Sequence, residues 1–171
     1  NLTTAGDITD SGNINVSGAA TFNSGTNVIT LGDATGEMTA FDSLTITGGA
    51  VAITEDGATS LSSANVASLA LTSSAGVALG SVTSTGDLSV TSGIQSGTAI
   101  TDSGNLAIAG TASFSAGESS IITLGDAVGE ETNFGSLSLT GGTVTVTEDS
   151  GTDLAAGSVT SLTLNSAGNI T

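Results

Sequence analysis

Residues 31–49 read LGDATGEMTAFDSLTITGG, and residues 124–142 read LGDAVGEETNFGSLSLTGG. At this offset of 93 residues, 13 of the 19 positions are identical. The match extends in both directions, so that residues 9–73 resemble residues 101–166, with an offset of 92 at the start of the match. Self-similarity of this kind is the sequence signature of a protein whose structural units stack on one another. The sequence therefore predicts an internal repeat of about 93 residues.

Short stretches within each repeat alternate apolar and polar residues, which is the period of a β-strand. Gly, Asn, Asp and Ser separate these stretches, and they are the residues that tight turns favour. No stretch shows a sustained period of 3.6 residues, so we expect no helix. The expected strands are residues 43–47, 51–54, 68–72, 88–90, 143–147 and 161–164.

Two all-β architectures fit short strands, a two-sheet sandwich and a β-solenoid. The long, nearly exact repeat favours the solenoid. The absence of Pro favours it as well, since every backbone N–H can then join a ladder between coils. We predict one continuous β-solenoid (β-helix) over residues 1–171, with coils of about 18–25 residues and about eight turns, as part of a longer tandem array. The inward positions should include Leu44, Ile46, Leu69, Leu71, Leu137, Leu139, Leu162 and Leu164, and Phe41 and Phe134 should hold equivalent positions about five coils apart.

The chain has no Lys, Arg or His, and its 16 acidic residues give a net charge of −16. Binding to nucleic acid or to an anionic membrane surface depends on Lys and Arg, so both kinds of partner are excluded. There is no run of about 20 apolar residues, which argues against a transmembrane segment. With no Cys, disulfides and thiolate metal sites are also excluded.

Catalysis on a β-solenoid would need a base and a group that stabilises charge. Carboxylates are the sole candidates here, and the adjacent pairs Glu55-Asp56 and Glu148-Asp149 are the closest approach to a glycosidase dyad. Neighbours on a strand point to opposite faces, so neither pair should converge on a substrate. We therefore predict that the protein is not an enzyme, with no catalytic residues and no organic cofactor.

Repeated acidic turns make Ca²⁺ a candidate ligand, because hard cations take several oxygen ligands. The candidate residues for weak sites are Asp33, Glu37, Asp126, Glu130, Asp149 and Asp153. The alternative is that these are solvated turn residues that keep the chain soluble. The sequence has neither the EF-hand spacing nor the Gly-rich nonapeptide that would decide between the two.

Three stretches resemble the repeat region of filamentous-haemagglutinin-like exoproteins, the β-helical adhesins of two-partner secretion. They are ITDSGNL at residues 100–106, FGSLSLTGG at residues 134–142 and VTVTED at residues 144–149. The resemblance extends over nearly the whole chain. It implies a right-handed β-helix that is exported across the outer membrane of a bacterium and works at the cell surface or outside the cell.

The expected function is therefore a structural or adhesive fibre segment of a large secreted repeat protein, such as a cell-surface filament, an adhesin or a matrix component. The alternative is a solenoid module that binds Ca²⁺ or another ligand at its repeated acidic turns. The expected partners are further copies of the rod, stacked end to end or covalently continuous. A host surface, an abiotic surface or a polysaccharide are further possible partners.

Overall fold

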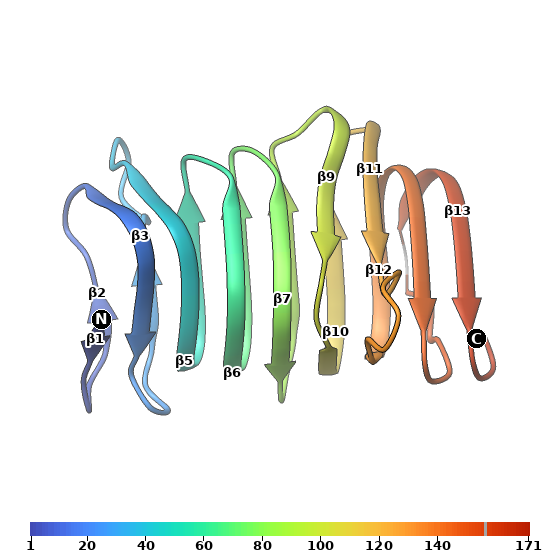
Figure 1. The fold of residues 1–171 in the computed structure, drawn as a ribbon, viewed down its shortest axis with the longest axis horizontal. Helices are drawn as coiled ribbons and strands as arrows, with labels where there is room; N and C mark the ends of the chain where they lie inside the picture. Colours follow the sequence, from blue (N-terminus) through green and yellow to red (C-terminus); the bar gives the residue numbers. More distant parts are fainter. Residues whose placement is uncertain (156) are drawn as a thin grey trace.

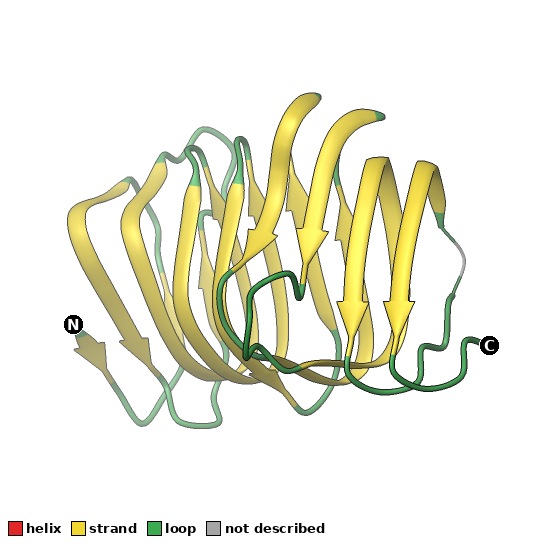
Figure 2. Ribbon diagram, turned by 45° about the vertical axis from the view of Figure 1, so that its right-hand side comes forward, coloured by secondary structure: helices red, strands yellow, loops and turns green. Residues whose placement is uncertain are grey.

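In a computed structural model, residues 1–155 and 157–171 are described, and they form one column of stacked β-coils (Figure 1). Strands and short loops make up the whole described part, and it contains no helix (Figure 2). The strands are β1 (Leu2–Thr3), β2 (Ile8–Thr9), β3 (Ile14–Asn23), β4 (Ile29–Leu31), β5 (Thr39–Glu55), β6 (Thr59–Ser73), β7 (Val77–Ser84), β8 (Leu88–Ser92), β9 (Ser96–Asp102), β10 (Leu106–Ser115), β11 (Ser119–Leu124), β12 (Thr132–Glu148) and β13 (Ser158–Ser166).

The predicted β-solenoid is confirmed, since every strand pairing of the described residues is parallel and joins one coil to the next. The chain descends the near face and ascends the far face while it advances from the N-terminal to the C-terminal end, which makes the coil right-handed (Figure 1). It completes about seven turns, slightly fewer than the eight predicted. Leu44 pairs with Leu61, 17 residues on, and Leu106 pairs with Thr132, 26 residues on, so coil length varies along the column.

The core is a narrow file of aliphatic side chains inside the coils. One stack of inward residues runs through seven strands: Ile8, Ile29, Val51, Leu69, Leu88, Ala112 and Leu137. Each of these is buried. Since alternate side chains of a strand point inward, the period-two pattern of the sequence fills this core without large rings.

Six of the eight predicted inward residues are fully buried, namely Leu44, Ile46, Leu69, Leu71, Leu137 and Leu139. The other two, Leu162 and Leu164, lie on β13, where they are partly exposed. The same alternation holds in β13, but no further described coil covers its outer side.

The 93-residue repeat does not contain a whole number of turns. From Ile8, four pairings lead to Leu88 and five lead to Ala112, whereas its sequence equivalent, Ile100, lies midway between those two. Equivalent residues therefore face different sides of the column. For the same reason, Phe41 and Phe134 are separated by between four and five turns rather than by the five predicted.

The local surroundings of these two rings are nevertheless the same. Phe41 packs edge-on against Phe22, with ring centroids 5.5 Å apart, and Phe134 packs in the same way against Phe114 at 5.8 Å. The repeat thus reproduces local packing but not the direction in which it faces.

Among the described residues there is no helix with the length and apolar character that crossing a membrane requires. This agrees with the absence of a long apolar run in the sequence.

Candidate functional site

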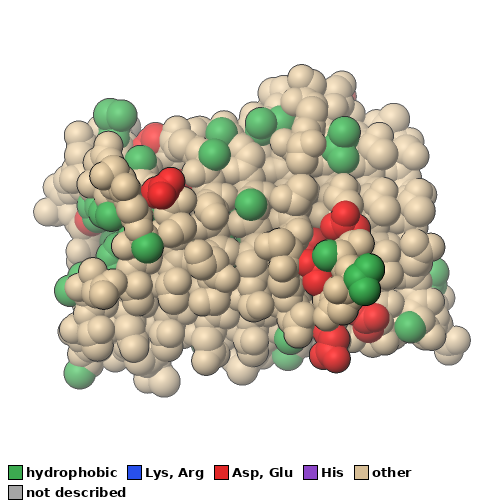
Figure 3. Space-filling model, in the orientation of Figure 1, with side chains coloured by type: hydrophobic (Ala, Val, Ile, Leu, Met, Phe, Trp, Pro, Cys, Tyr) green, Lys and Arg blue, Asp and Glu red, His purple; other side chains and the backbone are tan. Residues whose placement is uncertain are grey.

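Two groups of three carboxylates are the strongest candidates for a binding site. In the first, Asp33 and Glu37 meet Asp10, and one carboxylate oxygen from each residue lies within 4.8 Å of those from the other two. We call it the first acidic group. In the second, Asp126 and Glu130 meet Asp102 within the same limit, and we call it the second acidic group. Figure 3 shows acidic side chains gathered around the loop between β11 and β12, which carries the second group.

The loop of each group is shaped by glycines with positive φ. Gly125 and Gly129 have φ of 66° and 90°, and Gly32 and Gly36 have nearly the same values. These angles are readily adopted by Gly alone. A hydrogen bond within the loop also stabilises it, because the backbone N–H of Ala127 donates to Oε2 of Glu130 at 2.9 Å. The sequence LGDAVGE therefore positions its two acids through backbone conformation.

The third acid of each group comes from the preceding coil. The backbone N–H of Gly125 donates to both carboxylate oxygens of Asp102, at 3.0 and 3.2 Å. Gly32 makes the same two bonds to Asp10. The sequence prediction missed Asp10 and Asp102, although both lie in the repeated segment TDSGN. The repetition of this segment could have marked the two Asp residues as candidates. Their contact with a loop some 23 residues later could not be predicted, because it depends on the number of residues in the coil.

The second acidic group is the more deeply set of the two. Asp102 is 8% exposed, and Oε1 of Glu130 is buried with no hydrogen-bond partner among the described residues. The pKa of Asp102 is raised to about 6, mainly by burial. The hydrogen bond from Gly125 opposes this rise, and the neighbouring charges of Glu130 and Asp126 contribute to it. Three carboxylates held together in a chain without a cationic side chain form an environment that favours a hard cation such as Ca²⁺.

Asp149 and Asp153, also proposed from the sequence as ligands, lie outside both groups. Oδ2 of Asp149 accepts a hydrogen bond of 2.8 Å from the backbone N–H of Thr132, and Asp153 is exposed. In the structure Asp149 thus fixes the start of β12.

The buried glutamates Glu55 and Glu148 have a structural role that the sequence did not suggest. Oε1 of Glu148 accepts from the backbone N–H of Phe134 at 3.0 Å, and its Oε2 accepts from the hydroxyl of Thr152 at 2.6 Å. Glu55 makes the corresponding bonds. Burial raises the pKa of Glu55, while its hydrogen bonds act in the opposite direction. Each carboxylate therefore serves to satisfy buried donors at a corner of the coil.

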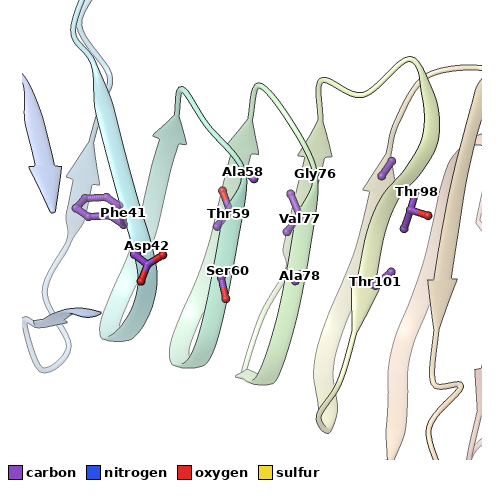
Figure 4. A pocket seen from close by; sticks show the side chains of 11 residues that line it. Phe41, Asp42, Ala58, Thr59, Ser60, Gly76, Val77, Ala78, Thr98 and Thr101 are labelled. Atoms are coloured by element: carbon purple, nitrogen blue, oxygen red, sulfur yellow. The ribbon is translucent and has the colours of Figure 1, made fainter. Parts of the chain in front are cut away.

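An open groove of about 390 Å³ runs across β5, β6, β7 and β9 (Figure 4). Its floor includes the outward row Ser60, Ala78 and Thr101, which pair in register. Of the described residues that line the groove, Asp42 is the one with a titratable side chain. A flat, small-residue surface of this kind offers hydrogen-bonding contact to a ligand but does not bring two titratable groups together.

The fold and the repeated loops define a β-solenoid repeat protein. The family described as repeats of unknown function (DUF5649) matches residues 1–45 and 66–140, and the chain therefore belongs to that family. No curated protein and no solved structure gives a significant match to the chain.

Proposed function

We propose that the chain is a segment of a structural or adhesive fibre, within a large secreted repeat protein that forms a cell-surface filament, an adhesin or a matrix component. The observation that carries this proposal is the continuous ladder of parallel strands from β1 to β13, which extends along one axis. The local packing of the first repeat recurs in the second repeat along this ladder. Because such a fold lengthens by the addition of coils, its length is the property that a fibre would use.

The charge of the chain is consistent with this role. A net charge of −16 with no compensating cation keeps thin rods apart at low salt and so opposes lateral clumping. The expected location is the bacterial cell surface or the extracellular space, after export across the outer membrane, as the resemblance to filamentous-haemagglutinin-like proteins implies. The expected partners are other rods, host or abiotic surfaces, or polysaccharide.

We propose a non-catalytic role. The adjacent pair Glu148-Asp149 is engaged in hydrogen bonds to the backbone of β12. The pair Glu55-Asp56 does the same for β5. Carboxylates that accept these backbone hydrogen bonds stabilise the corner of the coil. The two carboxylates of each pair do not converge on one position where a substrate could bind.

The test of the fibre proposal is the state of the purified 171-residue chain. We expect sedimentation and negative-stain electron microscopy to show elongated end-to-end assemblies at physiological salt. Immobilised protein should also retain cells or polysaccharide above the level of an equally acidic control protein. A compact monomer with no surface binding at any accessible concentration would reject the proposal.

A second candidate function is Ca²⁺ binding at the two acidic groups. The observation that favours it is the recurrence of the same three-carboxylate arrangement at both loops. In the second loop, Oε1 of Glu130 has no hydrogen-bond partner within the described part of the chain. A bound cation would supply the missing partner and stiffen the loop. Thermal melts in Ca²⁺ and in NaCl at matched ionic strength test this function.

A further inference from the structure

Three buried side-chain oxygens have no hydrogen-bond partner among the described residues, and all three lie in or directly after the loops that carry the two acidic groups. They are Oγ1 of Thr39, Oγ1 of Thr132 and Oε1 of Glu130. Thr39 and Thr132 stand 93 residues apart and are both 0% exposed, so the same unpartnered hydroxyl occurs in each repeat. Because an unpartnered buried polar group is costly, its recurrence at one place points to a ligand that supplies the missing contact.

Each hydroxyl lies beside the glycine that binds the third acid of its group. Oγ1 of Thr132 is 2.9 Å from the point where a Cβ on Gly125 would stand, and Oγ1 of Thr39 is 2.9 Å from the corresponding point on Gly32. The backbone N–H of Gly125 also donates to both carboxylate oxygens of Asp102. Since Thr132 and Asp102 are both buried, the hydroxyl and the carboxylate flank this glycine on the inner side of the second acidic group.

The backbone fixes each threonine in this position. The N–H of Thr132 donates to Oδ2 of Asp149 at 2.8 Å, its carbonyl accepts from the N–H of Asp149 at 2.9 Å, and the residue pairs in register with Leu106. Thr39 is held in the same way by Asp56. A hydroxyl on a backbone that is already fixed is preorganised for a ligand, because little freedom is lost on binding.

Two other buried threonines show that this fold can satisfy such a hydroxyl within the chain. Thr59 and Thr152 are 2% and 1% exposed, and their hydroxyls donate to Glu55 at 2.5 Å and to Glu148 at 2.6 Å. An unpartnered hydroxyl is therefore a property of the two acidic loops and not of buried threonines in general.

The spacing of the carboxylates fits one hard cation. One oxygen from each of Asp102, Asp126 and Glu130 lies within 4.8 Å of the other two. Ca²⁺ takes oxygen ligands at about 2.3–2.6 Å, so two oxygens on opposite sides of one ion are about 4.6–5.2 Å apart. The ion takes about six to eight oxygens, and three carboxylates therefore leave positions for a hydroxyl and for water.

We propose that the hydroxyls of Thr39 and Thr132 are further ligand groups of the two cation sites, each contributing its oxygen to Ca²⁺ directly or through one of the ion's waters. One ion at the second acidic group then supplies a partner to Oγ1 of Thr132 and to Oε1 of Glu130 together. The inference rests on the Ca²⁺ function proposed above and names residues that complete its sites.

A buried water is the competing occupant, since it needs only about two to four polar partners. A water would satisfy the hydroxyl but leave the repulsion among three neighbouring carboxylates in place, whereas a cation offsets it. The chain has no Lys, Arg or His that could do so instead. The cation is therefore the better occupant.

The test compares two double variants of the 171-residue chain. One carries Thr39→Val and Thr132→Val, which remove the unpartnered hydroxyls, and the matched control carries Thr59→Val and Thr152→Val, which remove partnered ones. Circular dichroism establishes that each variant folds. Thermal melts are recorded in EGTA and in about 10 mM Ca²⁺, with NaCl at matched ionic strength for comparison.

The two variants should respond in opposite ways. Without Ca²⁺, the Thr39 and Thr132 variant should melt at or above the native temperature, because unpartnered buried hydroxyls are removed. Its rise in Tm with Ca²⁺ should fall to about a third of the native rise, as expected when a site of millimolar affinity is weakened about tenfold. The control should melt below the native chain in both media, since Glu55 and Glu148 lose a donor, and keep the native rise.

A change of metal preference provides a second readout at one site. Thr132→Cys places a soft sulfur at the position of the hydroxyl, in a chain that has no other Cys. Thiolates favour Zn²⁺ over Ca²⁺. We expect this variant to lose Ca²⁺ stabilisation at the second acidic group and to gain a Zn²⁺-specific rise in Tm that Thr152→Cys does not show.

The outcomes separate the new ligands from the Ca²⁺ function itself. A native-sized Ca²⁺ rise in the Thr39 and Thr132 variant would mean that the hydroxyls hold a buried water only, and it would overturn the assignment while leaving the acidic sites intact. A Zn²⁺ response equal in the two Cys variants would also overturn it. If the native chain shows no Ca²⁺-specific rise, both the Ca²⁺ function and the assignment are rejected.

Discussion

The backbone N–H of Phe41 donates a hydrogen bond of 2.7 Å to Oε1 of Glu55, fourteen residues later in the chain. Phe41 lies near the start of β5, and the hydrogen bond of its backbone N–H to Glu55 is buried. The same carboxylate also accepts a hydrogen bond from the hydroxyl of Thr59. A buried acid is retained here because it satisfies two donors at once.

Removal of this carboxylate should therefore be costly. We expect Glu55→Ala to lower the free energy of unfolding by about 2–4 kcal/mol, because two buried donors lose their acceptor. Urea unfolding followed by circular dichroism measures the change. The control is Asp42→Asn on the exposed face of β5, which should stay within about 0.5 kcal/mol of the native chain. Equal effects of the two substitutions would contradict the structural role of Glu55.

Asp102 should make stability depend on pH. Its pKa is raised to about 6 in the folded chain from an ordinary value of 3.8, mainly by burial. Between these values the folded state holds a proton that the unfolded state has released, so stability falls as pH rises through this window. At pH 7 the charged form costs at most about 3 kcal/mol.

Asp102→Asn should therefore raise the melting temperature at pH 7 and flatten the profile between pH 4 and pH 6. Asp10→Asn, at the equivalent and more exposed position, is the matched control. Thermal melts at closely spaced pH values decide the matter. A profile for Asp102→Asn that keeps the slope of the native chain would show that another group is responsible.

Substitutions at Gly125 and Gly129 can distinguish the cost of a steric clash from the cost of backbone strain within one loop. Both have positive φ, but a Cβ on Gly125 would lie 2.2 Å from the carbonyl oxygen of Thr147, whereas one on Gly129 would meet no atom within 4 Å. We expect Gly129→Ala to cost about 1 kcal/mol from its φ alone, and Gly125→Ala to cost at least about 2 kcal/mol more, through displacement of the neighbouring coil. Chemical unfolding of both variants gives the comparison, and similar losses would mean that the coil yields at Gly125.

Calcium should stabilise the chain if the acidic groups bind it. For a site of millimolar affinity, 10 mM Ca²⁺ contributes about 1.4 kcal/mol of stability, which corresponds to a rise in Tm of about 2–5 °C. NaCl at matched ionic strength controls for screening.

The combined change Asp126→Asn and Glu130→Gln should abolish the part of this rise that the second acidic group contributes. Asp153→Asn, outside both acidic groups, should leave it unchanged. If NaCl raises the Tm as much as Ca²⁺ does, screening alone is the cause and the binding function is rejected.

Resistance to proteolysis follows from composition and from the ladder together. Trypsin has no cleavage site, since the chain contains no Lys or Arg. A broad-specificity protease should cut first in the loop between β11 and β12, where Val128 is fully exposed. Mass spectrometry of the first fragments should place their ends between Asp126 and Glu131. Early cuts within β6, which pairs with strands on both sides, would contradict the expected protection.

Local pattern predicted much of the fold. The alternation in residues 143–147 places Val144 and Val146 in the core, and the LGDAVGE segment forms the predicted loop that carries Asp126 and Glu130. These features depend on neighbours within a few residues, which the sequence displays directly. The exposure of Leu162 escaped prediction because it depends on what lies beyond β13, not on the strand itself.

The sequence by itself determined a helix-free stack of strands, the local packing that each repeat reproduces, and an acidic surface without cations. Tertiary structure alone decided that Asp102 joins Asp126 and Glu130, that Glu55 caps Phe41, and that Ile8 and Ile100 belong to different stacks. The physical reason lies in coil closure. The corners set the number of residues in each turn, and a change from 17 to 26 residues per coil moves every later side chain to a new direction around the axis, although the repeat in the sequence is unchanged.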